Sequence, residues 1–137
     1  MKTTCPSALN AIIEALGAEA VRRDSNDGQR TFGPPVQALA TVYPANADDV
    51  GKVLAIAQQH ALPVHPVSRG ANWGMGSRAP GTNGGIVLDL SRLDSISGFD
   101  VRQGRVYIQP GVTFRQLAEF LETRTQDWFL PTIGGPV

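Results

Sequence analysis

The sequence is poor in several features that would point to particular kinds of protein. Its single cysteine, Cys5, excludes an internal disulfide framework and any zinc site built from several cysteines. Its 12 basic residues balance its 12 acidic ones, and no basic stripe offers a surface to nucleic acid. It has neither an apolar run of about 18 residues nor a signal-peptide core, so we expect a cytoplasmic protein without a membrane span.

The 137 residues, of which 42% are hydrophobic, are enough to bury one core, so we expect a single domain. Apolar residues at helical spacing predict a first helix over residues 7–16, with Ser7 as its N-cap and Gly17 as its stop. An irregular connection is expected over residues 22–35, and a short buried strand over residues 38–43.

The next segments form a strand, a helix and a second strand. Asn46 is placed to cap a helix that ends near His60, and residues 62–67 form the strand after it. Because Pro63 and Pro66 cannot donate backbone hydrogen bonds, we expect this strand to lie at a sheet edge or to be barely paired. The order is that of a βαβ unit with a right-handed crossover.

The second half of the sequence adds shorter strands and one more helix. Residues 86–90 read as a strand, and residues 95–100 and 105–109 as an antiparallel pair joined by a tight turn. Thr113 and Gln116 have the spacing of a capping box that opens a helix. The predicted fold class is α+β, with a βαβ unit, antiparallel strands in a small mixed sheet, and flanking helices.

A long glycine-rich loop, residues 68–77, lies between two of these strands. It is not a P-loop, because no Gly-Lys-Ser/Thr occurs. Residues 74–79 fit the letters of a dinucleotide fingerprint, but Pro80 and Gly81 follow at once and no helix begins there. Two interpretations remain open: a cradle of backbone N–H groups for an anion, or a surface loop with glycines at its turns.

The side chains of the loop fit both interpretations. Arg69 and Arg78 could supply positive charge to a phosphate, or be solvated. Trp73 could cover a ligand or the core.

The loop sequence, residues 66–76, resembles that of the vanillyl-alcohol oxidase and 4-cresol methylhydroxylase family of flavoproteins. Residues 43–50, 87–93 and 110–114 are similar to three further segments of that family, in the same order and spacing. The resemblance runs from about residue 38 to the end of the chain. It implies the first subdomain of an FAD-binding module of the 4-cresol methylhydroxylase (PCMH) type, at residues 38–137. Residues 1–37 would form an N-terminal helix and connection, and the second subdomain and substrate domain would lie outside this chain.

The resemblance also implies that the loop wraps the FAD pyrophosphate, that a neighbouring turn approaches it, and that a further cofactor segment begins near the end of the chain. The implied cofactor-binding residues are Arg69, Gly70, Ala71, Asn72, Trp73, Gly74, Gly76, Ser77, Pro110, Gly111, Gly134, Gly135 and Pro136. Berberine-bridge-enzyme relatives carry a flavin-linking histidine near the position of Asn72, so we expect no covalent attachment through this loop. His60 and His65 fit structural roles, and we expect no catalytic residue and no metal site in this chain.

The function implied is FAD binding by the N-terminal part of a flavin-dependent oxidoreductase that acts on a small alcohol or phenol. This chain alone would be inactive, and its partners would be the flavin and either the missing C-terminal half or an oligomer partner. One alternative is a non-catalytic nucleotide-binding or interaction module that is complete as it stands. Another is a 2-hydroxy-acid oxidase of the glycolate type, which the residues at 72–74 favour less.

Overall fold

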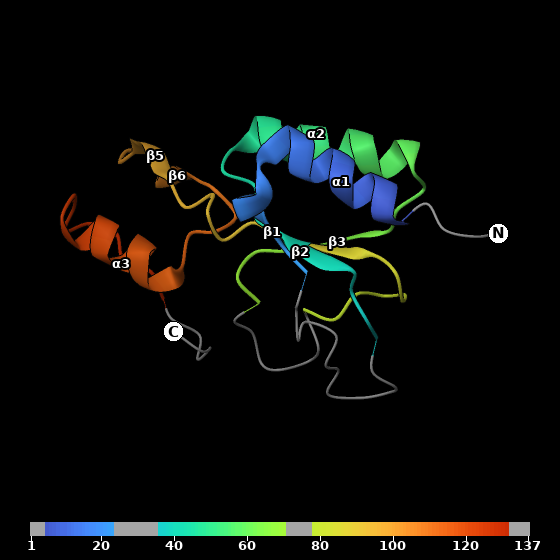
Figure 1. Cartoon of the computed structure of the whole chain (residues 1–137). Coiled ribbons are helices and arrows are strands. Elements are labelled where there is room, and N and C mark those ends of the chain that lie inside the picture. The colour runs from blue at the N-terminus through green and yellow to red at the C-terminus, as the bar shows by residue number, and fades with distance from the viewer. Residues whose placement is uncertain (1–4, 24–35, 71–77, 132–137) are drawn as a thin grey trace.

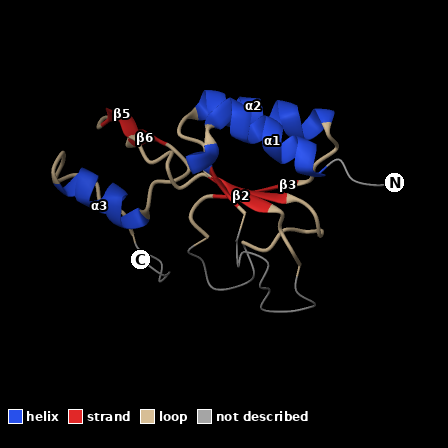
Figure 2. Cartoon of the chain, viewed as in Figure 1, coloured by secondary structure: helices blue, strands red, loops and turns tan. Residues whose placement is uncertain are grey.

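The structure, a computed structural model, describes residues 5–23, 36–70 and 78–131. It contains a four-stranded sheet with two helices over one face, and a two-stranded ribbon with a third helix to one side (Figures 1 and 2). The helices are α1 (Cys5–Leu16), α2 (Ala47–Gln59) and α3 (Phe114–Glu122), with a 3-10 helix, η1, at Ala18–Ala20. The strands are β1 (Val21–Arg22), β2 (Ala40–Val42), β3 (Val64–Val67), β4 (Ile86–Asp89), β5 (Ile96–Asp100) and β6 (Arg105–Ile108).

The larger sheet has the strand order β1-β2-β4-β3. β2 and β3 both run parallel to β4, and β1 pairs antiparallel with β2. The mixed sheet confirms the predicted fold class, and β3 lies at an edge, as its two prolines predict. The two strands of the βαβ unit are not direct neighbours, because β4 lies between them.

The first helix begins earlier than expected, at Cys5, so Ser7 lies inside α1 and is not its N-cap. Pro6 explains the difference, since proline is well tolerated in the first turn of a helix. Gly17 ends α1 as predicted, with a φ of 93° and an N–H that donates to the Ile13 carbonyl at 2.8 Å.

The strand β1 was not foreseen, because residues 22–35 read as an irregular connection. β1 is only two residues long, and backbone pairing rather than its own sequence pattern creates it. The Tyr43 N–H donates to the Ala20 carbonyl at 2.8 Å, which extends this pairing. Residues 24–35 lie outside the described part of the chain.

The main core lies between the sheet and the helices α1 and α2, which lie side by side over one face (Figure 1). Ile86 and Leu88 of β4 belong to this core and are at most 2% exposed. Because side chains alternate along a strand, Val87 and Asp89 face the opposite side of the sheet. Asp89 is nevertheless 3% exposed, so a carboxylate is buried on the face that the helices leave open.

The predicted caps are confirmed in α2 and α3. The Asn46 side chain accepts a hydrogen bond from the Asp49 N–H at 2.9 Å, and Thr113 and Gln116 form the capping box of α3. A hydrogen bond from Lys52 holds the pKa of Asp49 below its usual value, which favours the charged carboxylate at the positive end of α2.

The ribbon of β5 and β6 is antiparallel, as predicted, and α3 packs beside it. The rings of Phe99 and Phe120 meet edge to face, with centroids 5.9 Å apart. The indole N–H of Trp128 donates to the Val101 carbonyl at 2.7 Å. None of the helices in the described ranges is long and apolar enough to cross a membrane.

Candidate functional site

The parallel strands β2, β3 and β4 all end at the same edge of the sheet, since they share one direction. Ligands of parallel sheets bind at this carboxyl edge. The first residues of the glycine-rich loop follow β3 there, and Arg69 among them lies beside Asp94 of the chain that leaves β4. The turn at Pro110 and Gly111 reaches the same place from β6.

A hydrogen bond joins the start of the loop to that turn. The Arg69 Nε donates to the Gly111 carbonyl at 2.5 Å, across a separation of 42 residues. One Nη of Arg69 also lies 3.5 Å from the Asp94 carboxylate, and both of these side chains are partly exposed. The structure therefore brings together Arg69 and Gly70 with Pro110 and Gly111, four of the residues predicted to bind the cofactor.

Gly111 is required by the backbone around it. A Cβ atom at this position would lie 2.6–2.7 Å from the carbonyl oxygens of Leu90, Ser91 and Leu93, which is closer than real Cβ contacts. The Gly111 N–H donates to the Leu93 carbonyl at 2.7 Å. The turn thus packs directly on the chain that leaves β4, and only glycine fits this approach.

Arg78, the second candidate for phosphate charge, is engaged by the protein itself. One Nη pairs with the Asp89 carboxylate at 2.8 Å, and the other donates to the Arg69 carbonyl at 3.0 Å. The second oxygen of Asp89 accepts the Ser91 N–H at 2.9 Å, so Asp89 caps the turn after β4. A buried carboxylate therefore balances the positive charge of Arg78. The sequence interpretation had this side chain either solvated or bound to phosphate.

Gly70 is required by its backbone conformation and by its neighbour. Its φ is +67°, a region that side chains rarely adopt, and an added Cβ would overlap the Cγ of Arg78. The remaining residues predicted to bind the cofactor lie outside the described ranges, and their role stays a prediction. They are Ala71, Asn72, Trp73, Gly74, Gly76, Ser77, Gly134, Gly135 and Pro136.

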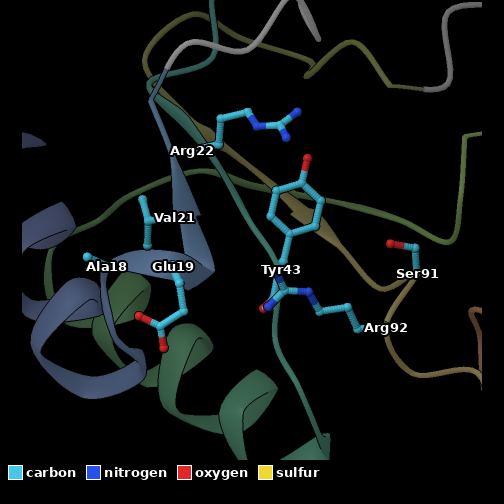
Figure 3. Close-up of a pocket in the computed structure, with 7 residues that line it drawn as sticks. All are labelled: Ala18, Glu19, Val21, Arg22, Tyr43, Ser91 and Arg92. Carbon is cyan, nitrogen blue, oxygen red and sulfur yellow. The ribbon is translucent and has the colours of Figure 1, made fainter.

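A second feature near the same edge was not predicted from the sequence. It is a pocket of about 440 Å³ (Figure 3), lined by Ala18, Glu19, Val21, Arg22, Tyr43, Ser91 and Arg92. Of the predicted cofactor residues that the structure describes, none lines it. Tyr43 and Arg92 lie within two segments that carry the family resemblance, but Arg22 belongs to the strand that the sequence pattern does not reveal.

Two arginines gather around Tyr43 in this pocket. The guanidinium carbons of Arg22 and Arg92 lie 5.7 and 5.4 Å from the centre of the tyrosine ring, within the range of cation–π attraction. Arg92 also donates to the Tyr43 carbonyl at 3.3 Å. The Glu19 carboxylate points away from the ring (Figure 3). The pocket is a positively charged surface around one aromatic ring.

The two histidines have the structural positions expected of them. His60 is the C-cap residue of α2, with its Nδ1 3.5 Å from the Ser7 hydroxyl, and His65 lies in the edge strand β3. Within the described part of the chain, no three His, Cys, Asp or Glu side chains gather as metal ligands.

Comparison with known proteins identifies the family. Residues 38–136 match the family described as FAD binding domain, and the chain belongs to this family, whose cofactor is FAD. The chain is 38% identical over 131 residues to 1'-carboxy-chondrochloren decarboxylase of Chondromyces crocatus, covering 93% of this chain and 24% of that protein. It is 31% identical over 103 residues to the flavoprotein subunit of 4-cresol dehydrogenase (hydroxylating) of Pseudomonas putida, covering 72% of this chain and 20% of that protein.

Solved structures agree with this assignment. The fold is similar to that of p-cresol methylhydroxylase with substrate bound, with a TM-score of 0.79 and 26% identity over 86% of this chain and 24% of that one. The 4-ethylphenol oxidase of Gulosibacter chungangensis gives a TM-score of 0.77 and 25% identity over the same shares of the two chains. The family resemblance drawn from the sequence is confirmed. The chain spans about a quarter of the length of these relatives.

The close packing of Gly111 leads to a prediction about stability. Gly111→Ala should lower the free energy of unfolding by about 1–3 kcal/mol, because the added methyl group overlaps three backbone carbonyls. Gly51→Ala is the matched control, since nothing lies within 4 Å of a Cβ there and alanine suits the interior of α2. Urea unfolding of both variants checks this, and equal stability of the two would contradict the packing described.

Proposed function

We propose that residues 69–77 hold the diphosphate of FAD, as the N-terminal part of a flavin-dependent oxidoreductase. The observation that carries this proposal is the hydrogen bond between Arg69 and Gly111. It joins the two segments that the family resemblance implies for cofactor binding, the loop and the turn, at the carboxyl edge of the parallel strands. We also propose that residues 38–137 form the first part of the FAD-binding domain, as the sequence predicts.

Arg69 has the chemistry that a diphosphate requires. A guanidinium group presents five N–H donors, of which the Gly111 carbonyl takes only Nε. The contact with Asp94 is long, at 3.5 Å, and the two side chains are 37% and 48% exposed. A bound phosphate can therefore replace Asp94 without breaking the hydrogen bond to Gly111. Charge-assisted hydrogen bonds of this kind offset the desolvation of the phosphate.

Bound FAD would supply the redox chemistry, while this chain would supply binding and orientation. The substrate we propose is a small alcohol or phenol, in line with the names of the relatives 4-cresol dehydrogenase and 4-ethylphenol oxidase. A 2-hydroxy acid is the second candidate, because the chain is also 29% identical over 139 residues to glycolate oxidase subunit GlcD of Bacillus subtilis. We place the residues that choose between them in the part of the relatives that this chain does not cover.

The exposed side chains on the ribbon of β5 and β6 indicate that further polypeptide packs against it. A two-stranded ribbon is only marginally stable alone. Large apolar side chains on this ribbon, on α3 and after it are exposed: Tyr107 (71%), Ile108 (49%), Phe114 (68%) and Phe129 (81%). We propose that the rest of the FAD-binding domain covers them, and that this chain alone is inactive. A self-contained module would leave this surface without a role. A cytoplasmic location stays a prediction.

The first test of the proposal is FAD affinity. The full-length protein should bind FAD, and Gly70→Ala should raise the Kd about tenfold or more. An alanine at a φ of +67° costs about 1–3 kcal/mol, and its methyl group displaces Arg78.

Flavin fluorescence during titration of the apoprotein measures this Kd. Gly81→Ala is the control on the far side of the loop, because a Cβ there meets nothing within 4 Å. No FAD binding by the wild type, or equal Kd values for the two variants, would overturn the proposal.

The second test concerns the exposed apolar surface. In a Cys5→Ser background, Tyr107→Cys should react rapidly with a thiol reagent in the 137-residue chain and slowly in the full-length protein, because only the longer protein covers this side chain. Gln103→Cys, in the exposed turn between β5 and β6, should react rapidly in both. Mass spectrometry follows the labelling. Rapid labelling of Tyr107→Cys in the full-length protein would contradict the expected cover.

A further inference from the structure

We propose that the ion pair between Arg78 and Asp89 positions the glycine-rich loop for the FAD diphosphate. We call this ion pair, together with the hydrogen bonds of its two side chains to the backbone, the latch. Neither residue touches the cofactor; both are positioning residues. The proposal rests on the function proposed for the loop. It names two residues that the family resemblance did not select as cofactor ligands.

Asp89 is the fixed end of the latch. Its side chain is 5% exposed and belongs to the last residue of β4, in the middle of the parallel part of the sheet. Both of its oxygens are engaged, one by the Ser91 N–H and one by Arg78. A buried carboxylate with both oxygens engaged is held in one position, so it can define where Arg78 lies.

Arg78 connects the two ends of the loop. Its second Nη donates to the Arg69 carbonyl at 3.0 Å, nine residues earlier in the sequence. The side chain passes so close to Gly70 that a Cβ there would overlap it. The ion pair therefore ties both ends of the loop to β4. Fixed ends lower the entropic cost of ligand binding, because a loop held at both ends has fewer conformations to lose.

The latch also sets the position of Arg69. The carbonyl of Arg69 accepts from Arg78, while its side chain donates to the Gly111 carbonyl. These bonds form one continuous chain of contacts from β4 through the loop to the turn at Gly111. Breaking the ion pair frees both the loop and the one guanidinium that we assign to the diphosphate.

The direction in which Asp89→Asn changes FAD affinity shows whether Arg78 positions the loop or binds the diphosphate directly. If Arg78 bound the diphosphate, Asp89 would compete with the ligand for it, and Asp89→Asn would tighten FAD binding. Removing a negative charge near an anion site also favours the anion in simple electrostatic terms. The latch predicts the opposite, because an asparagine can still accept from the Ser91 N–H but no longer holds the guanidinium by charge.

The experiment is FAD titration of the full-length apoprotein with Asp89→Asn, Arg78→Gln and both changes together. We expect each single variant to raise the Kd about tenfold. The double variant should raise it no further, because each single change already breaks the same ion pair. Arg115→Gln is the control and should leave the Kd unchanged, because Arg115 is an exposed arginine on α3, outside the contacts described at this edge. Thermal unfolding of each apoprotein separates loss of fold from loss of affinity.

Each outcome decides between the two proposals. If the wild type binds FAD and Asp89→Asn has an unchanged or lower Kd, the latch is overturned but the proposed function still stands. Failure of the wild type itself to bind FAD overturns the proposed function. If Asp89→Asn does not fold, Arg78→Gln and the salt dependence of the Kd decide. A direct phosphate contact would make the slope of log Kd against log salt shallower in this variant, while the latch predicts an unchanged slope.

Discussion

The ion pair between Asp89 and Arg78 is the interaction on which the arrangement of this edge depends. Asp89 ends the strand that lies between β2 and β3, and its pairing with Val67 of β3 fixes its position. Burying a carboxylate is costly unless a cation and hydrogen bonds compensate it, and here Arg78 and the Ser91 N–H do so. Gly70 follows from this ion pair, because it must leave room for Arg78. Gly111 is required separately, because it fits against the chain after β4.

The sheet brings the described parts of the site together. Helices on one face fill the core and leave the carboxyl edge of the sheet to polar groups such as Asp89. In a parallel sheet three strands end at the same edge, so segments far apart in the sequence meet there. The family assignment agrees with this geometry, since proteins that bind FAD share this fold with the chain.

Much of this could be predicted from the sequence, for identifiable reasons. Capping residues such as Asn46 and Thr113 act within one turn, so local sequence predicts them, and the prolines predict β3 at an edge. The insertion of β4 between β2 and β3 could not be predicted, because strand order depends on long-range pairing. The same holds for the partner of Arg78, since an arginine in a loop has no sequence pattern that points to a carboxylate 11 residues later.

The most direct measurement for the central claim is a crystal structure of the full-length protein with FAD. The account predicts that the diphosphate lies within hydrogen-bond distance, about 3 Å, of the backbone N–H groups of residues 70–77 and of the Arg69 guanidinium. Arg69 should keep its bond to Gly111, and Arg78 should stay on Asp89. A diphosphate bound elsewhere, or one held by Arg78 with Asp89 released, would contradict it.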